Sequence, residues 1–265
     1  MYSKLQLLNK YIQYRLKASN GKGHGTHSPF VFEFITQVLN DDRTYYCYDH
    51  IERLREKLKL DNTLLTIEDF GAGSRVNSHY QRAVSSIAKS ALKPKKFSQL
   101  LFRMVNHYQP ENILELGTSL GITTSYLASA NTNARVTTME GASAVADVAK
   151  SNFQSLQLNN IALVQGNFDE TLSSAIEHIP QIDFAFIDGN HRRDPTIAYY
   201  EKLLPKTHEH SILIFDDVHW SKEMEEAWEH IKNDSAVTLS IDLFFIGIVF
   251  FRKENKTKQH FVIKF

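Results

Sequence analysis

The segment Glu115-Leu116-Gly117-Thr118-Ser119-Leu120-Gly121 decides how the rest of the sequence is interpreted. It follows an apolar run at 113–116 and precedes a helical pattern over 123–130, which predicts a buried strand, a glycine turn and a helix. Glycine is needed where backbone approaches a ligand closely, and the N–H groups at a helix start are free to bind it. The third glycine of the dinucleotide fingerprint is missing. The turn therefore predicts a cofactor site and disfavours a dehydrogenase.

Strand and helix patterns alternate on the C-terminal side of this turn. The expected strands are 135–139, 161–165, 182–187 and 211–215, and the expected helices are 142–156, 169–179, 195–204 and 222–231. Strands buried on both faces and separated by helices predict an α/β fold with a doubly wound, Rossmann-like, mostly parallel sheet. Two last β-rich runs, 237–244 and 246–252, are expected to pair antiparallel at one edge of the sheet.

The N-terminal third has mostly helical patterns, so we predict two parts: a helical cap or substrate region at 1–96 and a cofactor domain at 97–265. A second glycine turn, Gly71-Ala72-Gly73, follows the apolar run 64–67. No strand ending in an acid comes after it, so it is a weaker cofactor candidate. We expect either a loop that covers the active site or a plain structural turn.

The charges of the chain cancel only in total. Thirty Lys and Arg balance 30 Asp and Glu, which argues against binding of nucleic acid through bulk charge. Residues 1–96, however, hold 16 basic against nine acidic residues, and 97–265 hold 14 against 21. Residues 1–32 have no acid at all. They are expected to form either a solvated helix face or a basic arm for an anionic partner.

Composition excludes several classes of protein. With 42% hydrophobic residues the chain is neither disordered nor collagen-like, and its single cysteine, Cys47, cannot form an internal disulfide. The N-terminal apolar residues are interrupted by lysine and arginine, so neither a signal peptide nor a membrane span is expected. The expected location is the cytoplasm, without a membrane partner.

Four short motifs carry a family resemblance. The glycine turn, Glu140-Gly141, Gly166-Asn167-Phe168 and Asp188 resemble, in order, the motifs of class I S-adenosylmethionine-dependent methyltransferases. The resemblance covers roughly 97–252. Within that superfamily, residues 186–191 (Phe-Ile-Asp-Gly-Asn-His) and 213–218 (Leu-Ile-Phe-Asp-Asp-Val) are similar to the catechol and caffeoyl-coenzyme A O-methyltransferases.

The resemblance implies S-adenosylmethionine as cofactor and assigns its contacts. Gly117, Ser119 and Gly121 would line the methionine part, Glu140 the ribose, and Asn167 with Phe168 the adenine. The remaining expected cofactor contacts are Glu115, Thr118, Gly141 and Asp188. An acid at the end of the next strand, as Glu140 is, can also accept both ribose hydroxyl hydrogens on chemical grounds.

Three carboxylates, Asp188, Asp216 and Asp217, fall at expected strand ends, where ligands of open α/β sheets bind. They would repel one another unless a cation or hydrogen-bond donors lay between them, and oxygen ligands suit Mg²⁺ or another hard divalent cation. In metal-dependent relatives an Asp and an Asp-Asn pair hold Mg²⁺, whereas this chain has Asp217 in place of the Asn. The alternative is that Asp188 bonds the cofactor while Asp216 or Asp217 is a polar loop residue.

His191 is the best candidate for a general base, because imidazole accepts a proton at neutral pH. The catechol-type relatives have a lysine at the matching place, and a solvated loop histidine is the alternative. His219 and Trp220 follow the acidic pair and are expected either to form a substrate wall or, somewhat more readily, to pack structurally.

The function expected first is O-methylation of a small hydroxylated acceptor, assisted by a base or a divalent metal, with Asp188 and His191 as catalytic residues. One alternative is a methyltransferase acting on RNA, such as tRNA, recruited by the basic N-terminal region. Another is a protein that binds S-adenosylmethionine without chemistry and acts through partners. The apolar run 243–251 is the expected basis of a homodimer.

Overall fold

A computed structural model describes residues 1–19, 21–23, 25, 27–68 and 79–265. The turn Gly71-Ala72-Gly73 lies outside these residues. The chain forms two compact units: Met1–Asp41 with Ile179–Phe265 is the first, and Asp42–His178 is the second. The predicted boundary at residue 96 stays a prediction. No helix in the described part of the chain has both the length and the apolar composition to span a bilayer.

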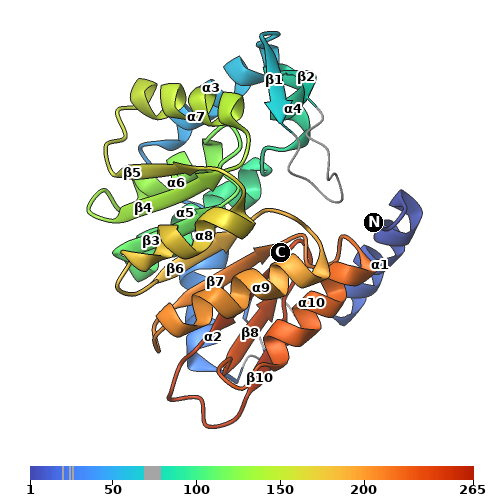
Figure 1. Cartoon of the computed structure of the whole chain (residues 1–265). Helices are drawn as coiled ribbons and strands as arrows, with labels where there is room; N and C mark the ends of the chain where they lie inside the picture. Colours follow the sequence, from blue (N-terminus) through green and yellow to red (C-terminus); the bar gives the residue numbers. More distant parts are fainter. Residues whose placement is uncertain (20, 24, 26, 69–78) are drawn as a thin grey trace. The chain divides into compact units, whose positions relative to one another are not determined.

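The second unit holds three parallel strands. Their order is β3 (Asn112–Leu116), β4 (Arg135–Glu140) and β5 (Ile161–Gln165), with β4 in the middle. The helices that follow them in the chain are α6 (Ile122–Ala130), α7 (Ser143–Ser155) and α8 (Phe168–Glu177). Every residue of α6 is buried, and α5 (Lys95–Tyr108) packs on it (Figure 1). These elements agree with the alternating pattern of the sequence.

The rest of the second unit combines two helices with a hairpin. Its helices α3 (Tyr48–Leu60) and α4 (Val84–Ser90) pack on each other and agree with the mostly helical pattern predicted for the N-terminal third. Strands β1 (Leu64–Glu68) and β2 (His79–Ala83) pair antiparallel. The sequence does not predict β2, because His-Tyr-Gln-Arg-Ala has no clear alternation and becomes a strand through its pairing with β1.

The first unit holds a mixed five-stranded set. The strand order is β10 (Gln259–Val262), β8 (Leu239–Asp242), β9 (Ile246–Phe250), β7 (Ile212–Asp216) and β6 (Phe184–Ile187). Helices α9 (Arg193–Leu203) and α10 (Lys222–Asn233) lie side by side over these strands (Figure 1). Helix α2 (Pro29–Glu33) runs on into the π-helix η1 (Phe34–Leu39), and the rings of Phe30 and Phe34 contact Phe250.

The expected position of the last hairpin is wrong. Strands β8 and β9 do pair antiparallel, but β9 lies between β7 and β8, and β10 is the edge strand. The sequence misses β10 because Gln-His-Phe-Val is short and half polar, and it pairs with β8, which lies 20 residues earlier. The run 243–251 is correspondingly buried inside this unit, except for the half-buried Phe245. It therefore offers no apolar surface for the expected homodimer.

The first helix, α1 (Lys4–Lys17), belongs to the first unit. Ser3 and Gln6 form a capping box at its start. Tyr14 and Ala18 are buried with Phe244, and Leu7, Tyr11, Phe245 and Val262 pack against them.

Candidate functional site

The glycine turn of the second unit has a strained backbone that glycine makes possible. Gly117 and Gly121 have φ values of 105° and 80°, and Ser119 has a φ of 48°. A Cβ atom on Gly121 would lie 2.5 Å from the ring of Phe153. The turn thus needs glycine at position 121 both for its dihedral angle and for its close approach to α7.

Glu140 closes this turn. Its Oε2 accepts the backbone N–H of Ser119 at 2.8 Å, and its Oε1 accepts that of Ala142 at 3.0 Å. Burial raises the pKa of Glu140, and the hydrogen bonds from Ala142, Ser119 and Gly141 partly oppose that shift. Because β3 and β4 pair in parallel, their carboxyl ends lie at the same edge of the sheet. Glu140 at the end of β4 is therefore held against the loop that follows β3.

Glu115 is fully buried at the end of β3. Its Oε2 accepts the hydroxyls of Thr138, at 2.6 Å, and of Thr124. Burial raises the pKa of Glu115 to about 7, although both hydroxyls act in the opposite direction. Within the described part of the chain, Oε1 of Glu115 and Oγ of Ser119 are buried without a hydrogen-bond partner. Buried polar atoms without partners point to a missing ligand.

The other predicted cofactor residues lie at the same ends of the three strands. Thr118 is buried, and its hydroxyl shares a 2.6 Å hydrogen bond with that of Thr138. Gly141 follows Glu140 and is half-buried. Asn167 is the N-cap of α8, where its side chain accepts the N–H of Asp169, and Phe168 is half-buried beside it. They lie at the carboxyl ends of β3, β4 and β5, the edge at which ligands of open α/β sheets bind.

The first unit brings together a second group of predicted residues. Asp188 directly follows β6, and Asp216 ends the neighbouring parallel strand β7. Ligand atoms of Asp188, His191 and Asp216 all lie within 4.8 Å of one another, and His191 Nε2 is 3.6 Å from Asp188 Oδ1. Asp216 is buried, whereas the other two are half-buried. Two carboxylates and an imidazole can bind a divalent cation or accept a proton.

Asp217 is not part of that group, although the sequence predicts it as a third metal ligand. Its φ is 52°, and its N–H donates to the carbonyl of Phe245 at 2.7 Å. The backbone thus turns directly after Asp216. His191, which the sequence predicts only as a base, occupies the third place in the group.

Asn190 shapes the segment between Asp188 and His191. It has a φ of 54°, its amide donates to the hydroxyl of Tyr199 at 3.1 Å, and its Oδ1 accepts from Arg192 Nε at 3.0 Å. No separate role was predicted for Asn190, although an Asn after a glycine is a turn signal.

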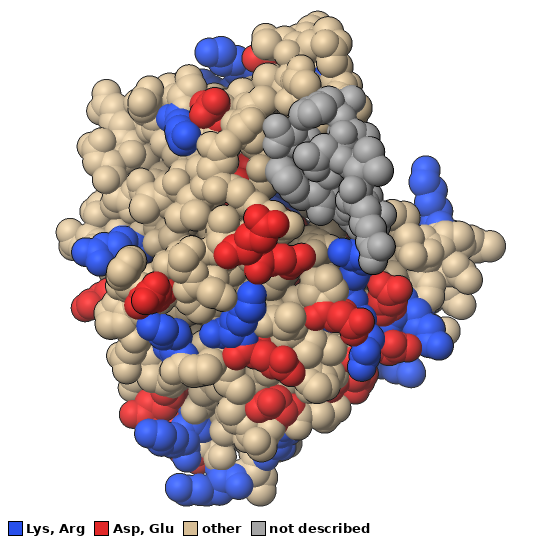
Figure 2. Space-filling model, in the orientation of Figure 1, with Lys and Arg blue, Asp and Glu red and all other residues tan. Residues whose placement is uncertain are grey.

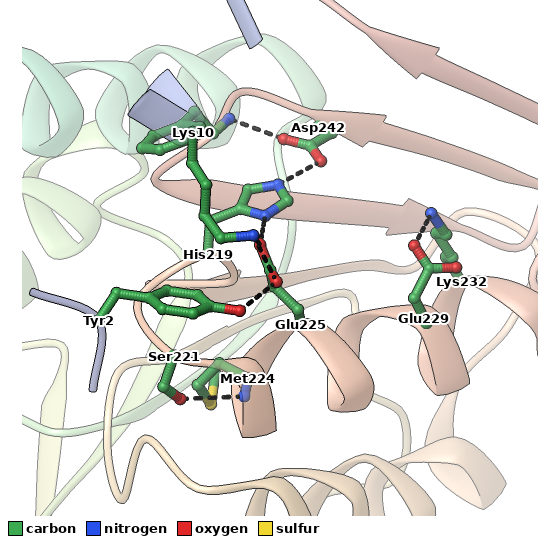
Figure 3. A network of polar contacts seen from close by, with 10 residues as sticks. Tyr2, Lys10, His219, Ser221, Met224, Glu225, Glu229, Lys232 and Asp242 are labelled. Carbon is green, nitrogen blue, oxygen red and sulfur yellow. Dashed lines mark hydrogen bonds and ion pairs between the residues drawn. The ribbon is translucent and has the colours of Figure 1, made fainter. Parts of the chain in front are cut away.

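His219 is packed among other side chains of the first unit and does not form the expected substrate wall. Its Nδ1 lies 2.9 Å from Glu225 Oε1 and its Nε2 lies 2.8 Å from Asp242 Oδ2 (Figure 3). Its ring stacks on Phe244 at 5.1 Å. Both ring nitrogens are occupied, which favours the packing alternative.

Comparison with known proteins decides the family. A model described as a methyltransferase domain matches residues 114–218, which include both groups of residues. Residues 114–218 are a methyltransferase domain. The sequence prediction of family and fold is confirmed. No curated protein sequence matches the chain.

Solved structures share the fold of this methyltransferase domain at low identity. A Podospora anserina methyltransferase, PaMTH1, solved with S-adenosylhomocysteine, has a TM-score of 0.59 and 10% identity, over 96% of this chain and 98% of that one. A Bacillus cereus O-methyltransferase, also with S-adenosylhomocysteine, has a TM-score of 0.53 and 21% identity, over 83% and 97%. TomG from Streptomyces achromogenes, an O-methyltransferase of tomaymycin synthesis solved with S-adenosylmethionine, has a TM-score of 0.52 and 17% identity, over 61% and 82%.

The threonines around Glu115 are the main omission of the sequence analysis of this methyltransferase domain. Thr124 is on α6 and Thr138 is on β4, and both donate to the same carboxylate oxygen. Thr138 pairs in register with Glu115. The signal available in the sequence was Glu115 itself, because an acid within an apolar strand needs a polar partner.

Proposed function

We propose that this chain is an O-methyltransferase that transfers the methyl group of S-adenosylmethionine to a hydroxyl of a small acceptor. The observation that carries the proposal is the group formed by Asp188, His191 and Asp216 at the carboxyl ends of β6 and β7. Structurally similar proteins include O-methyltransferases from Bacillus cereus and Streptomyces achromogenes, which supports this acceptor chemistry.

The residues of the glycine turn fit the cofactor. Glu115 Oε1 and Ser119 Oγ are buried polar atoms open to a hydrogen bond, and Gly117 leaves the backbone bare where a ligand can approach. We assign Glu140 to the ribose and Asn167 with Phe168 to the adenine. When bound there, S-adenosylmethionine supplies an electrophilic methyl group on a sulfonium. The acids of the turn lower the free energy of that positive charge.

His191 is the proposed general base. A neutral hydroxyl is a poor nucleophile, and His191 would accept the proton of the acceptor hydroxyl, while bound S-adenosylmethionine would supply the methyl group. Asp188, whose Oδ1 is 3.6 Å from Nε2 of His191, stabilises the imidazolium that results. Base catalysis of this kind contributes about 10²- to 10⁴-fold, and alignment of the reactants supplies further rate enhancement.

A divalent cation is the second proposal for the same group, since Asp188 and Asp216 offer carboxylate oxygens and His191 a nitrogen. A bound cation would polarise the acceptor hydroxyl and lower its pKa. In that case His191 is a metal ligand and not the base. The two roles of His191 exclude each other, so an experiment can separate them.

The test combines binding and turnover. Calorimetry with S-adenosylhomocysteine measures the cofactor site, and a screen of catechols and other hydroxylated acceptors measures product formation, with excess EDTA or with added Mn²⁺ or Mg²⁺. Turnover that persists in EDTA and is lost in His191→Ala supports the base. Turnover lost in EDTA and restored by metal supports the cation. Cofactor binding without any product across the screen would contradict the proposed reaction and favour a binding protein.

A further inference from the structure

Helix α1 has two apolar faces, and only one of them is used inside the unit. The inner face carries Leu7, Tyr11, Tyr14 and Ala18. The outer stripe, as we call Leu5, Leu8, Ile12 and Leu16, follows helical spacing and is 48% to 80% exposed. Exposed aliphatic side chains in a continuous row mark an interaction surface, whereas isolated ones do not.

The inner face is held firmly, so the outer stripe cannot turn inward. Lys10 Nζ donates to both oxygens of Glu225, at 2.9 and 3.0 Å, and the Tyr2 hydroxyl donates to Oε2 of the same carboxylate at 2.7 Å (Figure 3). The backbone N–H of Tyr2 also donates to the carbonyl of Trp220 at 3.0 Å. These contacts fix the rotation of α1 about its axis, so the stripe faces solvent.

The charges around the stripe select an anionic partner. Lys4, Arg15 and Lys17 are exposed on α1, and no Asp or Glu occurs before residue 33. On the face of the molecule in Figure 2, Lys and Arg are interspersed with Asp and Glu. The N-terminal helix therefore combines an apolar stripe with purely positive charge, the composition of a helix that lies in a membrane interface.

We infer that α1 docks this protein on an anionic membrane surface, with the outer stripe among the lipid acyl chains and its basic residues at the headgroups. A second copy of the chain is a less suitable partner for the outer stripe, because pairing two α1 helices would bring their basic residues together. The helix alone also offers a projected area of only about 210 Å², against about 800 Å² per partner in a stable interface. Binding to RNA would account for the basic residues of α1 but would leave the four aliphatic side chains of the outer stripe in water. The inference is independent of the proposed methyl acceptor.

Vesicle co-sedimentation of the full chain tests the inference. We expect binding to vesicles of phosphatidylglycerol and phosphatidylcholine in equal parts and little binding to pure phosphatidylcholine. Leu8→Ser with Ile12→Ser should lower the partition coefficient at least tenfold, because the side chains no longer insert. Lys4→Glu with Arg15→Glu should lower it more than about 25-fold, since each basic residue contributes about fivefold at an anionic surface.

Matched controls lie on other helices. Leu60→Ser removes a leucine that is 79% exposed at the end of α3, and Lys89→Glu reverses an exposed lysine on α4. Both should leave binding unchanged, and thermal unfolding should show that all variants remain folded. The inference is overturned if the protein does not bind vesicles at low salt, or if Leu8→Ser with Ile12→Ser leaves vesicle binding unchanged. It is also overturned if the protein forms a dimer that this double substitution dissociates. A tRNA gel shift lost in the charge variant, without vesicle binding, would instead indicate RNA.

Discussion

The backbone N–H of Ser119 donates to Oε2 of Glu140 at 2.8 Å, so the acid that ends β4 fixes the turn that follows β3. The same carboxylate also accepts the N–H of Ala142, which begins the next loop. One side chain therefore holds two loops of the cofactor edge in place. In the proposed cofactor complex, Glu140 would meet the ribose with its position already set by these two hydrogen bonds.

Glu140→Gln should weaken binding of S-adenosylhomocysteine by about 10- to 100-fold. The amide can accept only one of the two backbone N–H groups, and a hydrogen bond to a charged group contributes about 1.5 to 3 kcal/mol. Calorimetry measures the change in Kd. Glu56→Gln, at a glutamate that is 65% exposed on α3, is the control and should bind as the wild type does. Equal affinities for all three proteins would contradict the assignment of Glu140.

Gly121→Ala should lower the free energy of unfolding by about 3 kcal/mol, because it adds a left-handed dihedral penalty to a clash with Phe153. Chemical denaturation measures the loss. Gly25→Ala is a matched control, since Gly25 has a φ of 78° but no atom of the described residues lies within 4 Å of the added Cβ, and about 1 kcal/mol is expected there. Combining Gly121→Ala with Phe153→Leu should restore part of the loss, and a failure to do so would argue against the clash.

Glu115 should make the protein less stable as pH rises from about 4.5 to 7. Its pKa is raised from 4.5 to about 7, so within this window the folded chain keeps a proton that the unfolded chain has released. The free energy of unfolding should therefore fall by about 3 kcal/mol across the window and change little above it. Denaturation of the wild type and of Glu115→Gln at several pH values checks this. The difference between the two proteins should follow pH, and a constant difference would exclude the shifted pKa.

Asp216 and Asp217 should differ in their effect on metal binding, if a cation binds beside Asp188. Asp216→Asn should weaken Mn²⁺ binding at least tenfold, whereas Asp217→Asn should change it less than twofold, because only Asp216 lies with Asp188 and His191. Calorimetry or Mn²⁺ electron paramagnetic resonance measures both. Asp194→Asn, 84% exposed on α9, is the control. Equal losses of Mn²⁺ affinity in the two variants would instead support Asp188, Asp216 and Asp217, the ligands predicted from the sequence.

Glu225→Gln should loosen α1 and destabilise the protein by about 2 kcal/mol, since Tyr2, Lys10 and His219 share this carboxylate. Trypsin should then cleave within α1 faster than in the wild type, which mass spectrometry can follow. Glu229→Gln, on the same helix, affects a glutamate that is 61% exposed and bonds to Lys232 and Asn233, residues of α10 itself, so it should leave the cleavage rate unchanged. Identical cleavage of both variants would show that the network does not hold the helix.

The sequence predicted the strand, turn and helix around Gly117 well because their signals are local. A buried strand, a glycine turn and a helix follow one another within 20 residues, and Glu140 ends the next strand along the chain. Strand periodicity and the dihedral needs of glycine depend only on neighbouring residues. The prediction was poorer at the C-terminus, where β10 becomes a strand only by pairing with β8.

The sequence by itself determined the α/β alternation, the glycine turn and the carboxylates at the strand ends, because backbone preferences and burial patterns act over short distances. Only the tertiary structure decided that His191, and not Asp217, joins Asp188 and Asp216. Asp217 is separated from the group by a left-handed φ and a hydrogen bond to Phe245, a residue 28 positions away. The direction of a side chain depends on such distant pairings, and no local pattern encodes them.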